Sequence, residues 1–346
     1  MIVTVTANPA LDLTWHVEKI VAGGTHRADA GAARAGGKGL NVARVAHAQG
    51  AAALAITTTG GATGAEFTAE LEAAGVPHVL VPVTAATRRS IALVDEALGD
   101  TTIVNERGIA PTAAEWDALR DKVAMALAAG PAVLVISGSF PPATPDDVLP
   151  TLIGLGRAAG ATVIVDTSGP SLLAAADAGA SVLKPNEHEL AEATGLDDPV
   201  DGARELLRRG AELVLLSRGA DGMLAVTAAE AGAYERGADT PHVGRSPASG
   251  PTSGVSAPGT YRAHPPVDIL HARLGTALAG NPTGAGDAAV AACAVLMDAG
   301  IHDPAQILRR ATAWSAAAVL MPLAGEIHPT WTELESALIL TPKETR

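Results

Sequence analysis

The feature that most constrains the fold of this chain is the alternation of short, continuously apolar segments with longer amphipathic ones. The apolar segments are rich in β-branched residues and have the length of buried strands; they are residues 1–6, 53–58, 132–138, 162–167, 181–185 and 212–217. The segments between them have helical periodicity, most clearly at 39–49, 113–129 and 146–160. Apolar strands separated by helices are typical of a mostly parallel sheet covered on both faces. We therefore predict an α/β fold, which becomes helical from about residue 303 onward.

Three segments depart from this rhythm. Residues 12–36 and 87–108 alternate polar and apolar side chains around turn residues, which predicts half-exposed antiparallel strands in a small separate sheet. Small sheets inserted between βα units often serve as lids over a binding site. Residues 234–260 are rich in Gly, Pro, Ser and Thr, and we expect them to form a mobile surface insertion.

Composition narrows the class of protein. The formal net charge of −13 argues against non-specific binding to nucleic acid or to an anionic membrane. No apolar run reaches the roughly 18 residues of a membrane helix, and the N-terminal residues lack the pattern of a signal peptide. The single cysteine, Cys293, lies in an apolar helical run, so we expect a small buried hydrophobe rather than a reactive thiol. These features predict a cytoplasmic protein.

A glycine-rich turn directly before a helical pattern, NPTGAGDAA at 281–289, is the strongest candidate for a functional site. Glycines allow the N–H groups of residues 284–287 to point at one spot, and a helix beginning near Asp287 adds its positive dipole end, which favours an anion. The turn formally fits a dinucleotide fingerprint, but two helices follow it where that fold needs a further strand. Asp287 then either caps the helix or favours its first turn, or it is a general base for a substrate hydroxyl.

Three further turns lie at expected strand or helix ends. GGKG at 36–39 opens a helix in a geometry that suits an anion or a hydroxyl, although it misses the P-loop spacing; a flexible turn with a solvated lysine is the alternative. KPNEHEL at 184–190 places acidic side chains at a helix start, either for the helix dipole or for Mg²⁺ and its waters. LSRGADGML at 216–224 lets a nucleotide approach the backbone.

Taken in order, seven stretches resemble the PfkB (ribokinase-like) carbohydrate kinase family, within it the branch of 1-phosphofructokinases and tagatose-6-phosphate kinases. They are TANPALD, AGGKGLNVAR, SGSFPPA, VDTSG, KPNEHEL, LSRGADG and NPTGAGDA, and they cover nearly the whole chain except the region near 234–260. The resemblance implies one ribokinase-like domain over residues 1–346, with a central sheet between two helical layers and a small β-sheet lid from about 12–36 and 87–108. Lid strands in such folds often pair between subunits, so a homodimer through the lid is expected.

The same resemblance implies transfer of the ATP γ-phosphoryl group to a sugar hydroxyl, with ATP and Mg²⁺ as cofactors. Asp287 is similar to the catalytic base, and the N–H groups of Gly284, Ala285 and Gly286 to the anion hole. The positions that resemble sugar-contacting ones are Asp12, Gly37, Lys38, Asn41, Arg88 and Ser139. Those that resemble nucleotide-binding ones are Asn186, Ser217, Gly219 and Gly222. Glu189 completes the NxxE pattern with Asn186 and is expected to act on Mg²⁺ through water.

One departure concerns the acceptor. In the phosphosugar branch the lid strand commonly has the pattern TRxNxK, whereas this chain keeps Arg88 but has Ser90 for the asparagine and Ala92 for the lysine. The lost lysine removes charge-assisted hydrogen bonds worth roughly 1.5–3 kcal/mol each. Arg89 or Arg107 are candidate replacements, although strand alternation sends Arg89 to the face opposite Arg88.

The resulting prediction is an ATP- and Mg²⁺-dependent sugar kinase that acts on fructose 1-phosphate or tagatose 6-phosphate. Two alternatives stay open at this point. The acceptor is an unphosphorylated sugar or a nucleoside in the first. In the second, the chain is a non-catalytic sugar or nucleotide sensor, which the intact GAGD turn with Asp287 argues against.

Overall fold

The computed structural model describes residues 1–130, 133–229 and 266–342. Its main sheet has ten strands in the order β14-β13-β12-β11-β10-β9-β8-β1-β4-β5. From β5 to β11 every pairing is parallel. These strands are β1 (Ile2–Thr6), β4 (Ala53–Thr59), β5 (His78–Pro82), β8 (Val133–Ser137), β9 (Thr162–Asp166), β10 (Val182–Leu183) and β11 (Leu213–Ser217). The predicted parallel sheet is confirmed.

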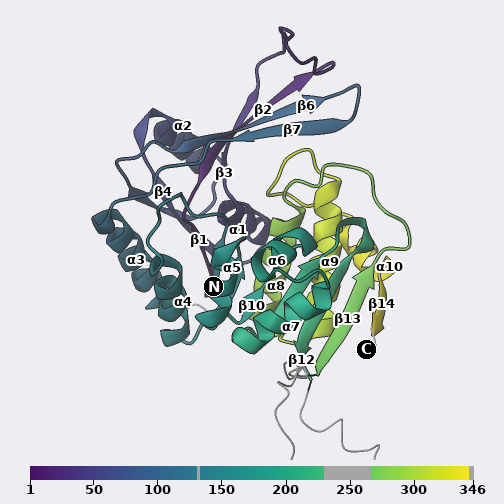
Figure 1. Cartoon of the computed structure of the whole chain (residues 1–346). Helices are drawn as coiled ribbons and strands as arrows, with labels where there is room; N and C mark the ends of the chain where they lie inside the picture. Colours follow the sequence, from purple (N-terminus) through teal and green to yellow (C-terminus); the bar gives the residue numbers. More distant parts are fainter. Residues whose placement is uncertain (131–132, 230–265, 343–346) are drawn as a thin grey trace, which may run out of the picture.

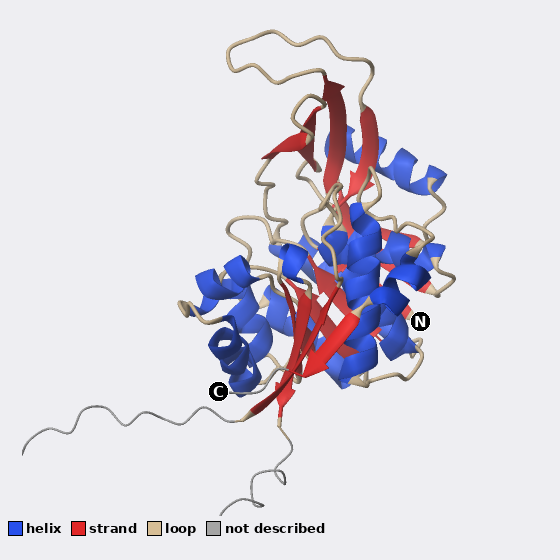
Figure 2. Ribbon diagram, turned by 90° about the vertical axis from the view of Figure 1, so that its right-hand side faces the viewer, coloured by secondary structure: helices blue, strands red, loops and turns tan. Residues whose placement is uncertain are grey.

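Helices cover both faces of the main sheet (Figure 2). One hydrophobic core lies under α3 (Ala113–Leu127), α4 (Val148–Ala158), α5 (Pro170–Asp177), α6 (Glu187–Thr194) and α7 (Pro199–Arg209). The other lies under α1 (Lys38–Ala48), α8 (Ala285–Asp298) and α9 (Pro304–Val319). Neighbouring strand residues alternate between the two cores, as Leu134 and Val135 do, because successive side chains point to opposite faces. This explains why the strands are apolar throughout.

A separate four-stranded sheet, called the small sheet below, projects from one end of the main sheet (Figure 1). Its order is β3-β2-β6-β7, with β2 (Ala10–Val17), β3 (Ala32–Gly36), β6 (Arg88–Asp95) and β7 (Asp100–Asn105). The expected antiparallel arrangement is wrong for one pair, because β2 and β6 run parallel. The reason is that β2 follows β1 and β6 follows β5, two strands with the same direction in the main sheet. Helix α2 (Gly61–Ala73) packs against β2 and β3.

The C-terminal third differs from the prediction in its strands. Three antiparallel strands extend the main sheet beyond β11: β12 (Met223–Ala228), β13 (Val267–Arg273) and β14 (Ile339–Pro342). Residues from 303 onward are therefore not all helical, since β14 follows α10 (Trp331–Ala337); this strand is short and lies at the edge of the sheet, where it carries little apolar pattern. The predicted insertion at 234–260 lies outside the described residues.

The single cysteine and the lengths of the helices bear on two of the predictions made from composition. Cys293 is fully buried in α8, and burial raises the pKa of its thiol to about 12, which agrees with an inert apolar side chain. Among the residues that the structure describes, none of the helices is long and apolar enough to span a membrane.

Candidate functional site

A cavity of about 1060 Å³ lies between the small sheet and the carboxyl ends of the parallel strands. Residues at or just beyond the ends of five neighbouring strands line it, namely Thr6, Gly138, Asp166, Lys184 and Ser217. Ligands of open α/β sheets bind at this edge because the loops that follow parallel strands converge there. Every site residue predicted from the sequence lines the cavity.

The turn before α8 forms one wall of the cavity. Gly284 is the N-terminal cap, with a φ of 85°, and the helix begins at Ala285 rather than at Asp287. A Cβ on Gly284 would lie 2.8 Å from the Cα of Ala324, so only glycine fits both the backbone angle and the space.

The amides of this turn are not equally available for an anion. The Ala285 N–H donates to the Pro282 carbonyl (3.2 Å), so it is already engaged within the turn, and its part in an anion hole stays a prediction. The turn tightens there because a helix start can satisfy an early N–H with a carbonyl three residues back. Within the described residues, the N–H groups of Gly284, Gly286 and Asp287 have no such partner. They are the amides that are free to bind an anion.

Asp287 is buried in the first turn of α8, with 5% of its surface exposed. The Asn41 side-chain amide on α1 donates to its Oδ2 (2.8 Å), which fixes the carboxylate. Burial raises the pKa of Asp287 to about 7; Lys38 and the Asn41 hydrogen bond oppose this shift, and Asp166 adds to it. Asp287 does not cap the helix, since the cap is Gly284 and no side chain caps it, but it does stand in the first turn, where a carboxylate is favoured by the helix dipole.

Two lysines surround a buried aspartate on the floor of the cavity. The Lys38 Nζ lies 3.3 Å from Asp166 Oδ2, and the Lys184 Nζ lies 3.5 Å from Asp166 Oδ1. Burial opposes ionisation of Asp166, but Lys184 and Lys38 outweigh it and lower its pKa, while Asp166 is the main cause of the raised pKa of Lys38. Asp166 and Lys38 are therefore both charged. Glu189 and Asp287 also act on Lys38, so the lysines of this floor face three carboxylates in all.

Asn186 and Glu189 cap α6 as a reciprocal pair. The Asn186 N–H donates to Glu189 Oε2 (2.9 Å), and the Glu189 N–H donates to Asn186 Oδ1 (2.8 Å). The other carboxylate oxygen, Glu189 Oε1, lies 3.7 Å from the Lys38 Nζ. The helix-start explanation is thus correct for this pair, and it leaves one carboxylate oxygen of Glu189 available to a ligand.

The small sheet contributes the opposite wall. Asp12 on β2 faces the cavity, and burial raises its pKa to about 6 against the opposing effects of Arg88, Arg34 and Arg44. Gly37, which caps α1 with a φ of 121°, brings Lys38 to this side.

Asn8 joins three other groups of that wall. Arg88 Nε donates to its carbonyl (3.3 Å), while its side-chain amide donates to Ser139 Oγ (3.2 Å) and to the Arg107 carbonyl (3.5 Å).

A third region of the cavity is lined by the segment after β11 and by α9. Ser217 ends β11, Gly219 begins a short 3₁₀ turn, and Gly222 closes it with a φ of 85°. A Cβ on Gly222 would lie 2.9 Å from the Cα of Arg273, so the backbones of two strands approach closely at this point. Thr276, Leu278, Thr312, Ser315 and Val319 add a mixed polar and apolar surface that suits a base and a ribose.

Residues 5–241 match the family described as pfkB family carbohydrate kinase. The chain belongs to this family. Among curated members it is 40% identical over 233 residues to 1-phosphofructokinase of Haloferax volcanii, covering 66% of this chain and 73% of that protein. It is 36% identical over 234 residues to ATP-dependent 6-phosphofructokinase isozyme 2 of Mycobacterium tuberculosis, covering 65% and 68%.

The fold agrees with solved members of the pfkB family. Phosphofructokinase-2 from Escherichia coli in complex with potassium superposes with a TM-score of 0.79 at 26% identity, over 97% of this chain and 98% of that one. The fold is therefore ribokinase-like, as predicted, and the chain is a carbohydrate kinase, a phosphotransferase with an alcohol group as acceptor.

Sequence reasoning missed several cavity-lining residues of this pfkB kinase: Asn8, Asn105, Asp166, Lys184, Thr312 and Ser315. Asp166 and Lys184 had a usable pattern, because each stands at the carboxyl end of a predicted parallel strand. Asn8 lies in the TANPALD stretch, but its role depends on contacts with residues 99 and 131 positions away. Thr312 and Ser315 lie within a long helix, and nothing local distinguishes them from other polar residues.

Proposed function

We propose that this kinase phosphorylates a sugar that already carries a phosphate, fructose 1-phosphate or tagatose 6-phosphate, and that Asp287 is its general base. The observation that carries the proposal is the position of Asp287: a buried carboxylate, held by Asn41, on the same helical turn as N–H groups that have no partner in the described part of the chain. A base and an anion-binding turn within three residues of each other suit phosphoryl transfer to a hydroxyl.

The acceptor hydroxyl would give its proton to Asp287 as its oxygen bonds to the γ-phosphorus, and the bond from that phosphorus to ADP breaks. A pKa of about 7 leaves Asp287 substantially ionised near neutral pH and still basic enough to take a proton. The N–H groups of Gly284 and Gly286, which have no backbone partner within the described residues, would stabilise the charge on the transferred group. Lys184 adds a fixed positive charge directly behind Gly286, since a Cβ there would lie 3.2 Å from its Nζ.

Two arginines support a phosphate on the acceptor. Arg88 and Arg107 both line the cavity, and within the described residues neither forms an ion pair. Burial lowers the pKa of Arg88 although Asp12 and Glu106 oppose the shift, so protein carboxylates do not fully balance this guanidinium. A phosphate dianion between the two arginines would supply the missing charge.

The structure also bears on the departure from TRxNxK. Ser90, which stands where the TRxNxK pattern has asparagine, pairs with Asn105 on the neighbouring strand β7, and both line the cavity. An asparagine is therefore present next to the position from which the pattern's asparagine is missing. Ala92 pairs with Ile103, and no cation stands at that level. Arg107, two residues beyond Asn105, supports the role of replacement cation, whereas Arg89 does not line the cavity.

ATP would occupy the region lined by Ser217, Gly219 and Gly222, with its phosphates toward Lys38 and the α8 turn. The described residues hold no cluster of three or more metal-ligating side chains, so Mg²⁺ would depend on the phosphates and on water. Glu189 fits such a site through water, because one of its oxygens is occupied by the helix cap. When bound, Mg²⁺ would neutralise charge on the transferred phosphoryl group.

A homodimer through the small sheet and a cytoplasmic location complete the proposal. The small sheet carries exposed apolar side chains, of which Leu98 is 72% and Val104 is 56% exposed. Such side chains favour burial against another chain. One solved form of phosphofructokinase-2 from Escherichia coli is described as tetrameric and inhibited, so a related kinase does self-associate.

An ADP-release assay tests the acceptor and the base together. The wild type would be compared with Asp287→Asn and Arg107→Gln on fructose 1-phosphate, tagatose 6-phosphate, fructose 6-phosphate, free fructose and nucleosides. Asp287→Asn should lower kcat by about 10²–10⁴-fold. Arg107→Gln should raise KM for phosphosugars and leave KM for free sugars unchanged.

The Asp287→Asn protein should nevertheless fold, because an amide keeps the acceptor for Asn41. The raised pKa of Asp287 means that its ionisation destabilises the folded state progressively from about pH 4 to pH 7, and fully above pH 7. At pH 8 the variant should therefore be the more stable protein. A preference of the wild type for free sugars would refute the phosphosugar acceptor, and near-normal turnover of Asp287→Asn would refute the base.

A further inference from the structure

The open edge of the small sheet is held by an ion pair instead of by another strand. β3 is the last strand of that sheet, and its residue Ala35 turns both main-chain groups outward. The Ala35 N–H donates to Glu70 Oε2 (2.7 Å), and its carbonyl accepts from Arg44 Nη2 (3.1 Å). Arg44 Nη2 also contacts Glu70 Oε2 (2.5 Å). Side chains of α1 and α2 thus occupy the place that a neighbouring strand would take.

This pair, called the edge clamp below, lies one helical turn from the residue that orients the proposed base. Asn41 and Arg44 are three residues apart on α1, so their side chains are neighbours on the helix surface. Gly325 shows how close they are, because a Cβ there would lie 3.1 Å from both Asn41 Oδ1 and Arg44 Cδ. A displacement of Arg44 would therefore shift the Asn41 side chain and, through its hydrogen bond, the Asp287 carboxylate.

The short segment 324–326 provides a second connection. Glu326 pairs with Arg34, the β3 residue next to Ala35 (3.0 Å). Ala324, two residues earlier, packs against Gly284 at the start of α8. The same segment therefore touches the edge of the small sheet, α1 and the anion-binding turn.

We propose that Arg44 and Glu70 are positioning residues, which fix the sugar-binding small sheet relative to Asn41 and Asp287. The role assigned to Asp287 in this inference rests on the proposed function. Arg44 is 6% exposed, and its Nε has no hydrogen-bond partner within the described residues. Arg44 thus depends on Glu70 and on the Ala35 carbonyl, and losing Glu70 would leave a buried charge unpaired.

The edge clamp also acts on Asp12, which lies opposite Arg34 in the β2–β3 register. The charged groups that face Asp12 are Arg88 on β6, Arg34 on β3, Arg44 on α1 and Glu70 on α2. Glu70 raises the pKa of Asp12, and the three arginines lower it. Removal of the Glu70 charge should therefore lower the pKa of Asp12.

Steady-state kinetics of Glu70→Ala and Glu70→Gln test the clamp with the best phosphosugar from the assay above. In Glu70→Ala the sugar KM should rise by about tenfold or more, while the ATP KM should stay within about twofold. Glu70→Gln keeps an oxygen for the Ala35 N–H but loses the charge. Its sugar KM should lie between those of the wild type and Glu70→Ala. The pH at which the sugar KM begins to change on acidification should also be lower than in the wild type, because the pKa of Asp12 falls.

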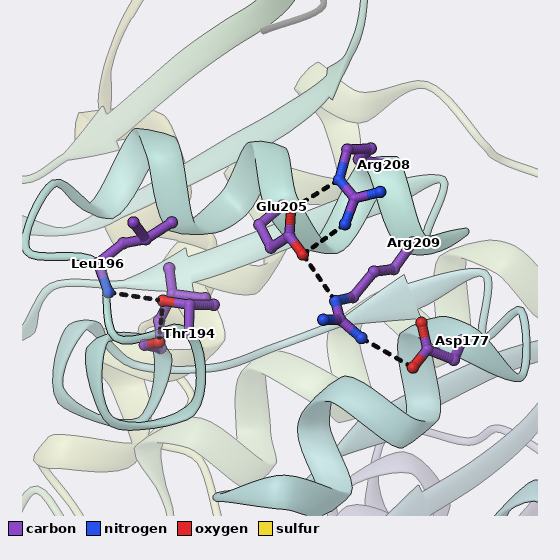
Figure 3. Close-up of polar contacts among 7 residues, drawn as sticks. Asp177, Thr194, Leu196, Glu205, Arg208 and Arg209 are labelled. Atoms are coloured by element: carbon purple, nitrogen blue, oxygen red, sulfur yellow. Dashed lines mark hydrogen bonds and ion pairs between the residues drawn. The ribbon is translucent and has the colours of Figure 1, made fainter. Parts of the chain in front are cut away.

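A matched control is available on the far side of the main sheet. Glu205 on α7 accepts from Arg208 Nε (2.7 Å) and Arg209 Nε (2.8 Å), and Arg209 also contacts Asp177 on α5 (2.8 Å) (Figure 3). None of these residues lines the cavity. Glu205→Gln removes an arginine–glutamate ion pair that is more exposed than the edge clamp, and it should leave both KM values and the pH profile unchanged.

An unchanged sugar KM in both Glu70 variants would overturn the inference, as would a loss of kcat that only follows the fraction of folded enzyme. If Glu70→Ala does not fold, the KM and pH profile of Glu70→Gln decide. The two proposals fail in different ways. Activity in Asp287→Asn would refute the base without touching the sugar KM of the Glu70 variants, and unchanged Glu70 variants would leave the kcat loss in Asp287→Asn intact.

Discussion

Asp287 meets two requirements that oppose each other: a general base must be ionised to accept a proton, whereas burial favours the neutral form. Its pKa of about 7 therefore predicts a pH dependence. The value of kcat/KM for the sugar should fall tenfold per pH unit below about pH 7, because this ratio reports ionisations of the free enzyme. The fall should steepen near pH 6, where Asp12 also takes up a proton. Initial rates at subsaturating sugar between pH 5 and 9 measure it.

Asn41→Leu separates Asp287 from other groups that titrate in this range. The Asn41 hydrogen bond lowers the pKa of Asp287. Its loss should therefore move the inflection near pH 7, which belongs to Asp287, toward higher pH and leave the inflection near pH 6, which belongs to Asp12, in place. Glu205→Gln serves as the control and should keep the wild-type profile. If the inflection near pH 7 stays at the same pH in Asn41→Leu, the titration belongs to a group other than Asp287.

At the scale of the element, the start of α8 contains two glycines that are required for different reasons. Gly286 is the second residue of the helix and has no positive φ, so its backbone accepts alanine, but the added Cβ would lie 3.2 Å from the Lys184 Nζ. Gly286→Ala should therefore keep the melting temperature and lower kcat by about 10²-fold or more, since the methyl group crowds the anion-binding turn. Thermal melts and turnover at saturating substrates measure the two effects.

Gly284→Ala is the comparison, because it should lower stability as well as turnover. Its φ of 85° disfavours any side chain, and the added carbon would meet Ala324. Gly300→Ala, with a φ of 79° and open space around it, should reduce stability alone. Equal effects of Gly284→Ala and Gly286→Ala on melting temperature would contradict the distinction drawn here.

The predictable elements were those whose pattern is local. Strands buried on both faces, such as β1 and β8, are continuous apolar runs, so their bounds follow from the sequence within a residue or two. β14 is four residues long and partly exposed, and its pairing with β13 is set by tertiary contact rather than by periodicity. The direction of β6 relative to β2 was also unpredictable, since it depends on how two distant strands leave the main sheet.

The site was predictable where a motif carries its own geometry, as in the glycine turn before Asp287. It was not predictable where partners come from distant elements. Asn41 was expected to contact the sugar, and the structure shows that it also holds Asp287 across 246 positions of sequence. Glu189 was expected at Mg²⁺, and the structure shows that half of its carboxylate caps a helix.

On the scale of the whole molecule, the two substrates would differ in which parts of the protein they contact. Two groups predicted for the sugar, Asp12 and Arg88, stand on the small sheet, and others, such as Asn41, stand on the main body, which is the main sheet with its helices. Those predicted for the nucleotide, Ser217 and Gly222, stand on the main body alone. Only the sugar would therefore connect the small sheet and the main body directly. The small sheet also has the less buried strands: every residue of β7 except Thr101 is exposed. Such strands are expected to open locally at low free energy.

Hydrogen exchange should consequently report on the sugar more than on the nucleotide. A phosphosugar at 100 times its Kd should slow amide exchange in β6 and β7 by up to about 100-fold, because a ligand that binds only the ordered form stabilises it by that factor. ATP alone should protect residues around Ser217 and α9 and leave β6 and β7 unchanged. The buried strands β8 and β9 are the internal control and should exchange equally slowly in every sample. Protection of β7 by ATP without sugar would mean that the small sheet closes on the nucleotide. That result would contradict the prediction that only the sugar contacts both the small sheet and the main body.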